Sequence, residues 1–161
     1  MKETKDTQKM QDDAIDLSVD TIKKKRFRIN GDPNAILELH TSDINIIPRL
    51  KEGYDRLMEL SHNVAELDID TDTDEGFDQL AEELKKLDAE MRKELDKIFD
   101  APVSEVCAPV GSIYDIKNGK FQFEYIIEAL APLYDNDFRS EFSKMRKNIS
   151  SHTSKYTKRK K

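Results

Sequence analysis

The residues best placed for chemistry by type and spacing are four aspartates at alternate positions between residues 68 and 74. Alternate carboxylates resemble the first half of an EF-hand calcium loop, which also needs Gly at its sixth position and Glu at its twelfth. Loops that start at Asp68 or Asp70 have neither residue where it is needed. We therefore expect no calcium site and interpret the segment as a capped connection between two helices.

Nucleophilic or metal chemistry would depend on the single cysteine, Cys107, and on His40, His62 and His152. The histidines are scattered along the sequence, whereas metal ligands must converge. A Cys107–His nucleophilic pair could form only in space, and a packed apolar cysteine is the alternative that we prefer. The five glycines are isolated, so no phosphate-binding loop is present. We expect a protein that is not an enzyme, with no catalytic residue, metal site or cofactor.

The charged residues indicate the class of partner. The chain ends in a basic run, residues 155–161, but its net charge is −6 and residues 68–75 are acidic. Phosphate binding needs a broad cationic surface, so this balance argues against nucleic acid as the main partner. The basic run is either a solubilising end or a tail for an acidic partner.

Composition favours a small helical protein. The chain has 161 residues, of which 37% are charged, and only five Gly and five Pro, too few for the turns of a many-stranded fold. One cysteine excludes an internal disulfide and fits a reducing compartment. There is neither an apolar run long enough for a membrane span nor a signal-peptide core. We expect a cytoplasmic protein without a membrane partner.

The clearest β signal is a hairpin at about residues 25–40. Residues 25–29 and 35–40 alternate apolar and polar side chains around the turn-forming segment 30–34. A lone hairpin is unstable in water, so its face of Phe27, Ile29, Leu37 and Leu39 should pack on a helix. Ahead of it, residues 1–21 are expected to be a disordered or loosely attached arm; a short edge strand at Ile15, Leu17 and Val19 is the alternative.

Two long amphipathic helices follow and should form an antiparallel pair. The first is expected to start at Asn45 and to carry an apolar stripe from Ile47 to Leu67. The second is expected to be capped by Thr73 or Asp74 and to carry its stripe from Phe77 to Ile98. A short helix should pass through Cys107, and an irregular segment should follow it. A further helix should stop near Pro132, and a last one should run from Asp137 to about Ser150.

The fold class is therefore mainly α (α+β), with an N-terminal β-hairpin packed on a bundle of about four helices and flexible termini. Residues 22–150 should form one domain, and 151–161 a basic disordered tail. These elements leave too little mass to cover every apolar stripe, so part of a stripe should contact another chain, either a second copy or a helical partner. The candidate partner-binding residues are Leu84, Leu87, Met91, Phe142 and Met145.

Three segments resemble the small tail assembly chaperones of long-tailed bacteriophages. They are the hairpin and helix start at 27–43, the stretch from 98–107 through a glycine-containing turn to 121–130, and the basic end 158–161. The resemblance implies a non-enzymatic protein of the bacterial host cytoplasm that binds the long helical tape measure protein and keeps it soluble during tail assembly. It also implies that a longer frameshifted product can exist. It transfers no site residue.

Two other functions remain open at this point. A virion structural component, such as a connector or tail-completion protein, would use the same elements for permanent assembly. A small regulatory nucleic-acid-binding protein would use the basic end.

Overall fold

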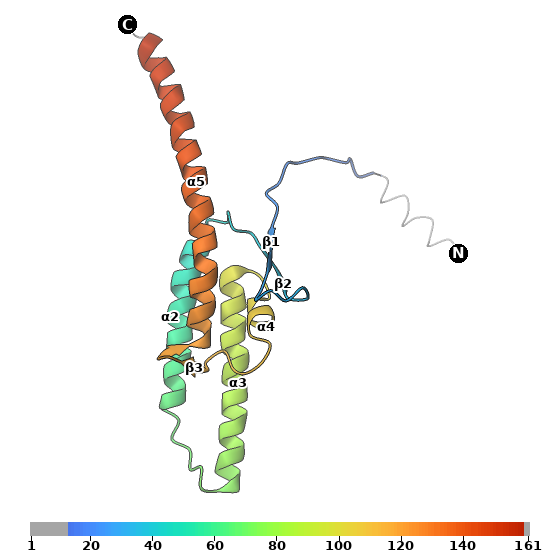
Figure 1. Cartoon of the computed structure of the whole chain (residues 1–161), viewed down its shortest axis with the longest axis vertical. Helices are drawn as coiled ribbons and strands as arrows, with labels where there is room; N and C mark the ends of the chain where they lie inside the picture. The colour runs from blue at the N-terminus through green and yellow to red at the C-terminus, as the bar shows by residue number, and fades with distance from the viewer. Residues whose placement is uncertain (1–12, 160–161) are drawn as a thin grey trace, which may run out of the picture.

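The computed structural model describes residues 13–159, without the side chains of Ala65, Phe142, Met145, Arg146 and residues 148–159. Its elements in chain order are β1 (Lys25–Arg28), β2 (Ile36–Leu39), α2 (Ile46–Ala65), α3 (Asp74–Phe99), α4 (Val103–Cys107), β3 (Ile116–Lys117), β4 (Lys120–Phe121) and α5 (Gln122–Arg159). The fold is mainly helical with an N-terminal antiparallel β-hairpin, which confirms the fold class expected from the sequence (Figure 1).

The predicted hairpin is confirmed. β1 and β2 pair antiparallel with Phe27 opposite Leu37, and the turn has positive φ at Asn30 and Gly31. Leu37 and Leu39 are almost fully buried in the main core. Before β1, residues 14–24 contain no helix or strand, so the alternative edge strand is not formed; residues 1–12 of the expected arm lie outside the described part.

α2 and α3 form the predicted antiparallel pair (Figure 1). Asn45 is the N-cap of α2, but its side chain makes no capping hydrogen bond; Asp43 instead accepts from the Asn45 backbone N–H. The apolar stripe of α2 starts at Ile46, which is buried, and not at the expected Ile47, which is exposed. Gly53 is required where the helices approach, because a Cβ there would collide with Ile98.

The aspartate-rich connection is a helix cap, as the sequence indicates. Thr73 is the N-cap of α3, and its side-chain oxygen accepts from the Gly76 backbone N–H at 3.0 Å. The carboxylate of Asp70 accepts from the backbone N–H of Asp72. A Cβ at Gly76 would collide with the backbone oxygen of Asp70, so this tight turn needs glycine.

Three charged residues at four-residue spacing on α3 fix the segment that follows it. The Arg92 guanidinium donates to the backbone oxygens of Ser104, Ala108 and Gly111 and pairs with Asp88 at 2.8 Å. Asp96 accepts from the backbone N–H and the hydroxyl of Ser104 at the start of α4. This charged face therefore holds the irregular chain between α3 and α5.

Between α4 and α5 lies a small ribbon, β3–β4, that the sequence analysis treats only as irregular chain. Its two-residue turn, Asn118 and Gly119, has positive φ at both positions, as tight hairpins require. The strands have two residues each, too few for an alternating pattern to be visible in the sequence.

The last two predicted helices are a single helix, which corrects the sequence analysis. α5 continues through Pro132, where the sequence predicts a stop, and its backbone is helical to Arg159. A proline lacks the N–H that a helix interior uses, but the helix can continue when packing on both sides of it compensates. Here Ile126, Leu130 and Tyr134 are all buried.

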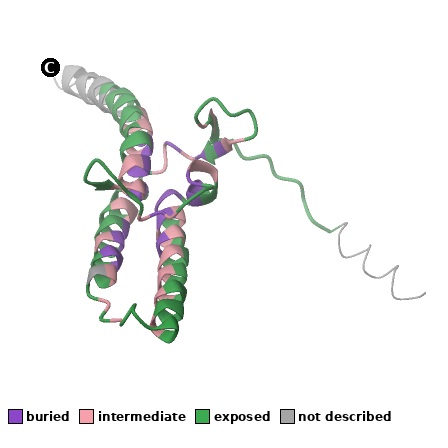
Figure 2. Ribbon diagram, turned by 60° about the horizontal axis from the view of Figure 1, so that its bottom comes forward, coloured by how far each residue is buried: buried purple, intermediate pink, exposed green. Residues whose placement is uncertain are grey.

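The core lies where α2, α3, α4, α5 and the hairpin meet, and Figure 2 shows that the end of the α2–α3 pair near their connection is largely exposed. The fully buried side chains of α3 begin only at Met91 and continue with Leu95, Ile98 and Phe99. Phe77, near the start of α3, is 61% exposed. α5 crosses this core and projects beyond it (Figure 1).

Candidate protein-binding groove

A surface hollow lies between the start of α2 and the middle of α5. It has a volume of about 600 Å³. Residues 46–50 of α2 and 127–138 of α5 form its walls. Seven of its ten lining residues are apolar, and the other three are a tyrosine and two acidic residues. The lining residues are Ile46, Ile47, Leu50, Ile127, Glu128, Ala131, Pro132, Tyr134, Asp135 and Phe138.

The groove exists because α5 does not stop at Pro132. Ile127, Ala131, Tyr134 and Phe138 follow one another at steps of four, three and four residues, so they share one face of a continuous helix. This face is turned toward α2 across the groove, and farther along the Tyr54 hydroxyl of α2 donates to Glu124 of α5. The same spacing in the sequence, read across the proline, could have indicated a single helix.

Ile47 is the most exposed apolar side chain of this groove, at 58%. Exposing a large apolar side chain forgoes about 1.5–3 kcal/mol of burial, so a groove that keeps one open favours a partner that covers it. The neighbouring Ile44, just before α2, is also more than half exposed. Together these side chains make the α2 wall of the groove an available apolar surface.

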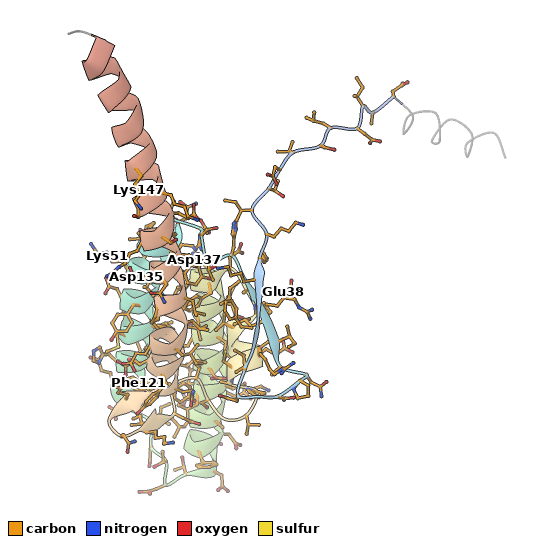
Figure 3. The ribbon with its side chains drawn as sticks, turned by 45° about the horizontal axis from the view of Figure 1, so that its top comes forward. Glu38, Lys51, Phe121, Asp135, Asp137 and Lys147 are labelled. Atoms are coloured by element: carbon orange, nitrogen blue, oxygen red, sulfur yellow. The ribbon has the colours of Figure 1, made fainter. Side chains whose placement is uncertain are left out.

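Both charged residues that line the groove are acidic and lie on α5. Glu128 pairs with Lys120 at 2.6 Å, and Asp135 pairs with Arg139 at 3.1 Å. All four side chains are about half exposed or more, so these pairs contribute little to stability and leave the carboxylates accessible. Figure 3 labels Asp135 on α5 and Lys51 on α2.

Tyr134 closes the inner side of the groove. Its side chain is buried, and its ring lies 5.9 Å from that of Phe99. Burial raises the pKa of Tyr134 to about 12, so its hydroxyl stays protonated at neutral pH. That hydroxyl has no hydrogen-bond partner among the described residues. The groove therefore has a rigid aromatic back wall and no ionisable group poised for proton transfer there.

The predicted partner-binding residues do not form one surface. Met91 is fully buried in the core, so it cannot contact a partner and is removed from the candidate set. Leu84 and Leu87 are half-buried, and Leu87 lines a smaller hollow of about 160 Å³ between α2 and α3 with Leu60 and Val64. The side chains of Phe142 and Met145 lie outside the described ones.

Sites for other chemistry receive no geometric support in the described chain. Burial, and then the nearby Asp96 carboxylate, raise the pKa of Cys107 to about 11, so its thiol stays protonated and is a poor nucleophile at neutral pH. Among the side chains that the structure describes, no group of three or more His, Cys, Asp or Glu residues is arranged to hold a metal ion. None of the described helices is both long and apolar enough to cross a bilayer.

No model of a known protein family, no curated protein and no solved structure matches this chain.

Proposed function

We propose that this protein is a non-enzymatic binding factor that holds an amphipathic helix of another polypeptide in the α2–α5 groove. The observation that carries the proposal is the groove itself, with a volume of about 600 Å³, mainly apolar walls and Ile47 exposed at its edge. Grooves between two helices commonly accept the apolar face of a third, through anchors spaced three or four residues apart.

The acidic side chains at the groove favour a helix whose polar flank carries Lys or Arg. Glu128 and Asp135 both lie on the α5 wall, so cations beside the apolar anchors of the partner would meet them. Such exposed pairs tune orientation and association rate more than affinity. Affinity would come from the buried apolar anchors.

In its finer form, the proposal is that the partner is the long helical tape measure protein of a bacteriophage tail, bound in the host cytoplasm before the tail tube forms. Three features support this form: the resemblance of residues 27–43, 98–130 and 158–161 to tail assembly chaperones, a groove shaped for helices, and a highly charged surface. A chaperone for a long repetitive helix needs modest affinity per contact and many equivalent sites on its client.

The test is capture from infected or induced host cells with a photo-crosslinking residue at position 48, beside the groove, followed by identification of the crosslinked peptide. We expect a single long helical polypeptide, crosslinked within segments that have apolar residues every three or four positions. Ile47→Asp should reduce its recovery at least tenfold, because a carboxylate at the groove would have to be desolvated.

Phe77→Asp is the matched control, because Phe77 is as exposed as Ile47 but lies near the start of α3, away from the groove. Both changes place Asp in the first turns of a helix, where its charge is tolerated. Capture that is unaffected by Ile47→Asp, or lost equally in both variants, would rule out the groove. Recovery of only metabolic proteins or nucleic acid would contradict the function.

A further inference from the structure

The segment before β1 is an apolar strip that its own chain leaves uncovered. Ile15, Leu17 and Val19 are 93%, 83% and 66% exposed, and residues 14–24 form no helix or strand. In an extended chain, alternate side chains point to opposite sides, so these three share one side and Asp16 and Asp20 share the other. Between Ile15 and Asp20 the strip therefore has one apolar and one acidic side, and its apolar side is suited to lie on an apolar surface.

The strip joins β1 next to α5, on the side of α5 that faces away from α2 and the groove. Lys25, the first residue of β1, pairs with Asp137 of α5 at 2.8 Å, and the buried Thr41 hydroxyl donates to the same carboxylate. Asp137 lies within one turn of the groove residues Tyr134 and Phe138. Figures 1 and 3 show β1 and α2 on opposite sides of α5, with the strip leading away from the body.

Charge complementarity indicates how the strip would lie in a groove. Lys23 lies four positions after Val19, on the same side of an extended strip as Ile15, Leu17 and Val19, whereas the two charged residues that line the groove, Glu128 and Asp135, are acidic. With the apolar side inward, Lys23 can approach the α5 wall while Asp16 and Asp20 stay in solvent. The opposite arrangement would place carboxylates against carboxylates and against isoleucines.

We propose that Ile15, Leu17 and Val19 occupy the α2–α5 groove of a second copy of this chain, by reciprocal exchange of the two strips. A two-fold axis beside the helical turn that contains Asp137 would bring the partner's groove close to Lys25, where each strip joins its own body. The segment from Leu17 to Lys25 can span roughly 27 Å when extended. This inference rests on the proposed function only in that both use the same groove. A helical partner would then displace the strip and separate the copies.

The experiment uses two full-length variants with one cysteine each, made in a Cys107→Ala background. One carries Leu17→Cys and the other Ile47→Cys, and tags of different size distinguish their products. Mixed and mildly oxidised, they can form a disulfide between positions 17 and 47 only between two molecules. We expect this mixed dimer to form at least five times faster than with a Phe77→Cys partner, whose position is equally exposed.

Light scattering after size exclusion provides the second measurement. The unmodified chain should be a dimer at micromolar concentration, and Leu17→Asp with Val19→Asp should make it a monomer of unchanged helicity. The proposal is overturned if position 17 reacts equally with positions 47 and 77. It is also overturned if one molecule carrying both Leu17→Cys and Ile47→Cys closes on itself while no mixed dimer forms.

Failure of this inference can be distinguished from failure of the proposed function. If capture of a helical polypeptide depends on Ile47 but no disulfide between positions 17 and 47 forms, the groove binds a partner and the strip does not use it. If the disulfide forms and no helical polypeptide is captured, the groove serves self-association alone.

Discussion

Asp137 of α5 links three parts of the chain through one carboxylate, because it accepts from Lys25 of β1 and from Thr41, two residues after β2. The hydrogen bond from Lys25, and then that from Thr41, lower the pKa of Asp137 below its usual value. A carboxylate with a lowered pKa in the folded state stabilises the fold when it is ionised. We therefore expect Asp137→Asn to lower the free energy of unfolding by about 1 kcal/mol at pH 7.

The pH dependence makes this prediction specific. The contribution of Asp137 is present above the unfolded-state pKa of about 3.9 and is lost as pH falls through the lower pKa of the folded state. The difference between the wild type and Asp137→Asn in urea unfolding should therefore shrink below about pH 4. Asp135→Asn is the control, because its pair with Arg139 is exposed and should cost less than about 0.5 kcal/mol. An equal effect of both changes would contradict this account.

Arg92 is the other single residue on which much of the fold depends. Its guanidinium reaches three backbone oxygens and Asp88, which lysine cannot reproduce because its ammonium is compact and has no fork. Arg92→Lys should therefore destabilise the protein by roughly 2–3 kcal/mol in urea unfolding. Arg56→Lys, at an exposed pair with Glu59, should have almost no effect. A loss as small as that of Arg56→Lys would mean that solvent replaces the contacts of Arg92.

At the scale of elements, Pro132 is the clearest conflict between local preference and tertiary packing. It lies inside α5 and is exposed, so the helix continues there without one backbone hydrogen bond. We expect Pro132→Ala to raise the free energy of unfolding by about 1–3 kcal/mol, because the missing N–H returns and no buried group is lost. Thermal unfolding followed by circular dichroism measures this; a lower midpoint would show that the proline ring supports the groove wall.

The same conflict explains which elements the sequence can predict. The hairpin, the Thr73 cap and the α2–α3 pair have local signals that agree with the structure, namely turn residues, capping side chains and helical spacing. The continuation of α5 depends on burial of Ile126, Leu130 and Tyr134 against other elements, and no local rule contains that information. The role of Arg92 is hidden for the same reason, since its partners are backbone oxygens 12 to 19 residues away.

The sequence predicts an exposed apolar surface on a helix, but it does not locate the α2–α5 groove. Met91 is buried in the core and Leu87 packs against it, whereas the groove is lined by Ile47, Ala131 and Phe138. Helical spacing identifies the apolar side of each helix. It does not show which part of that side another helix covers, and a groove is the uncovered remainder.

At the scale of the whole molecule, burial is graded along the α2–α3 pair. The fully buried side chains of α3 start at Met91, seventeen positions after the helix begins at Asp74, and Leu80, Leu84 and Leu87 are only half-buried. Regions with few buried apolar contacts open at lower free energy than the whole protein unfolds. The connecting end of the pair should therefore open locally while the rest stays folded.

Hydrogen exchange followed by mass spectrometry tests this. Peptides from residues 74–84 should exchange their amides by local opening, with protection at least 100-fold lower than peptides from residues 91–99 and 123–130. Leu87→Asp should speed exchange further at the connecting end and leave the core peptides nearly unchanged, because Leu87 packs at the edge of the core. Equal protection across α3 would instead make the molecule one cooperative unit. A graded response would mean that the connecting end of the α2–α3 pair opens locally while the groove, whose α5 wall is held by the buried core, stays folded. The groove would then be the rigid surface suited to a partner.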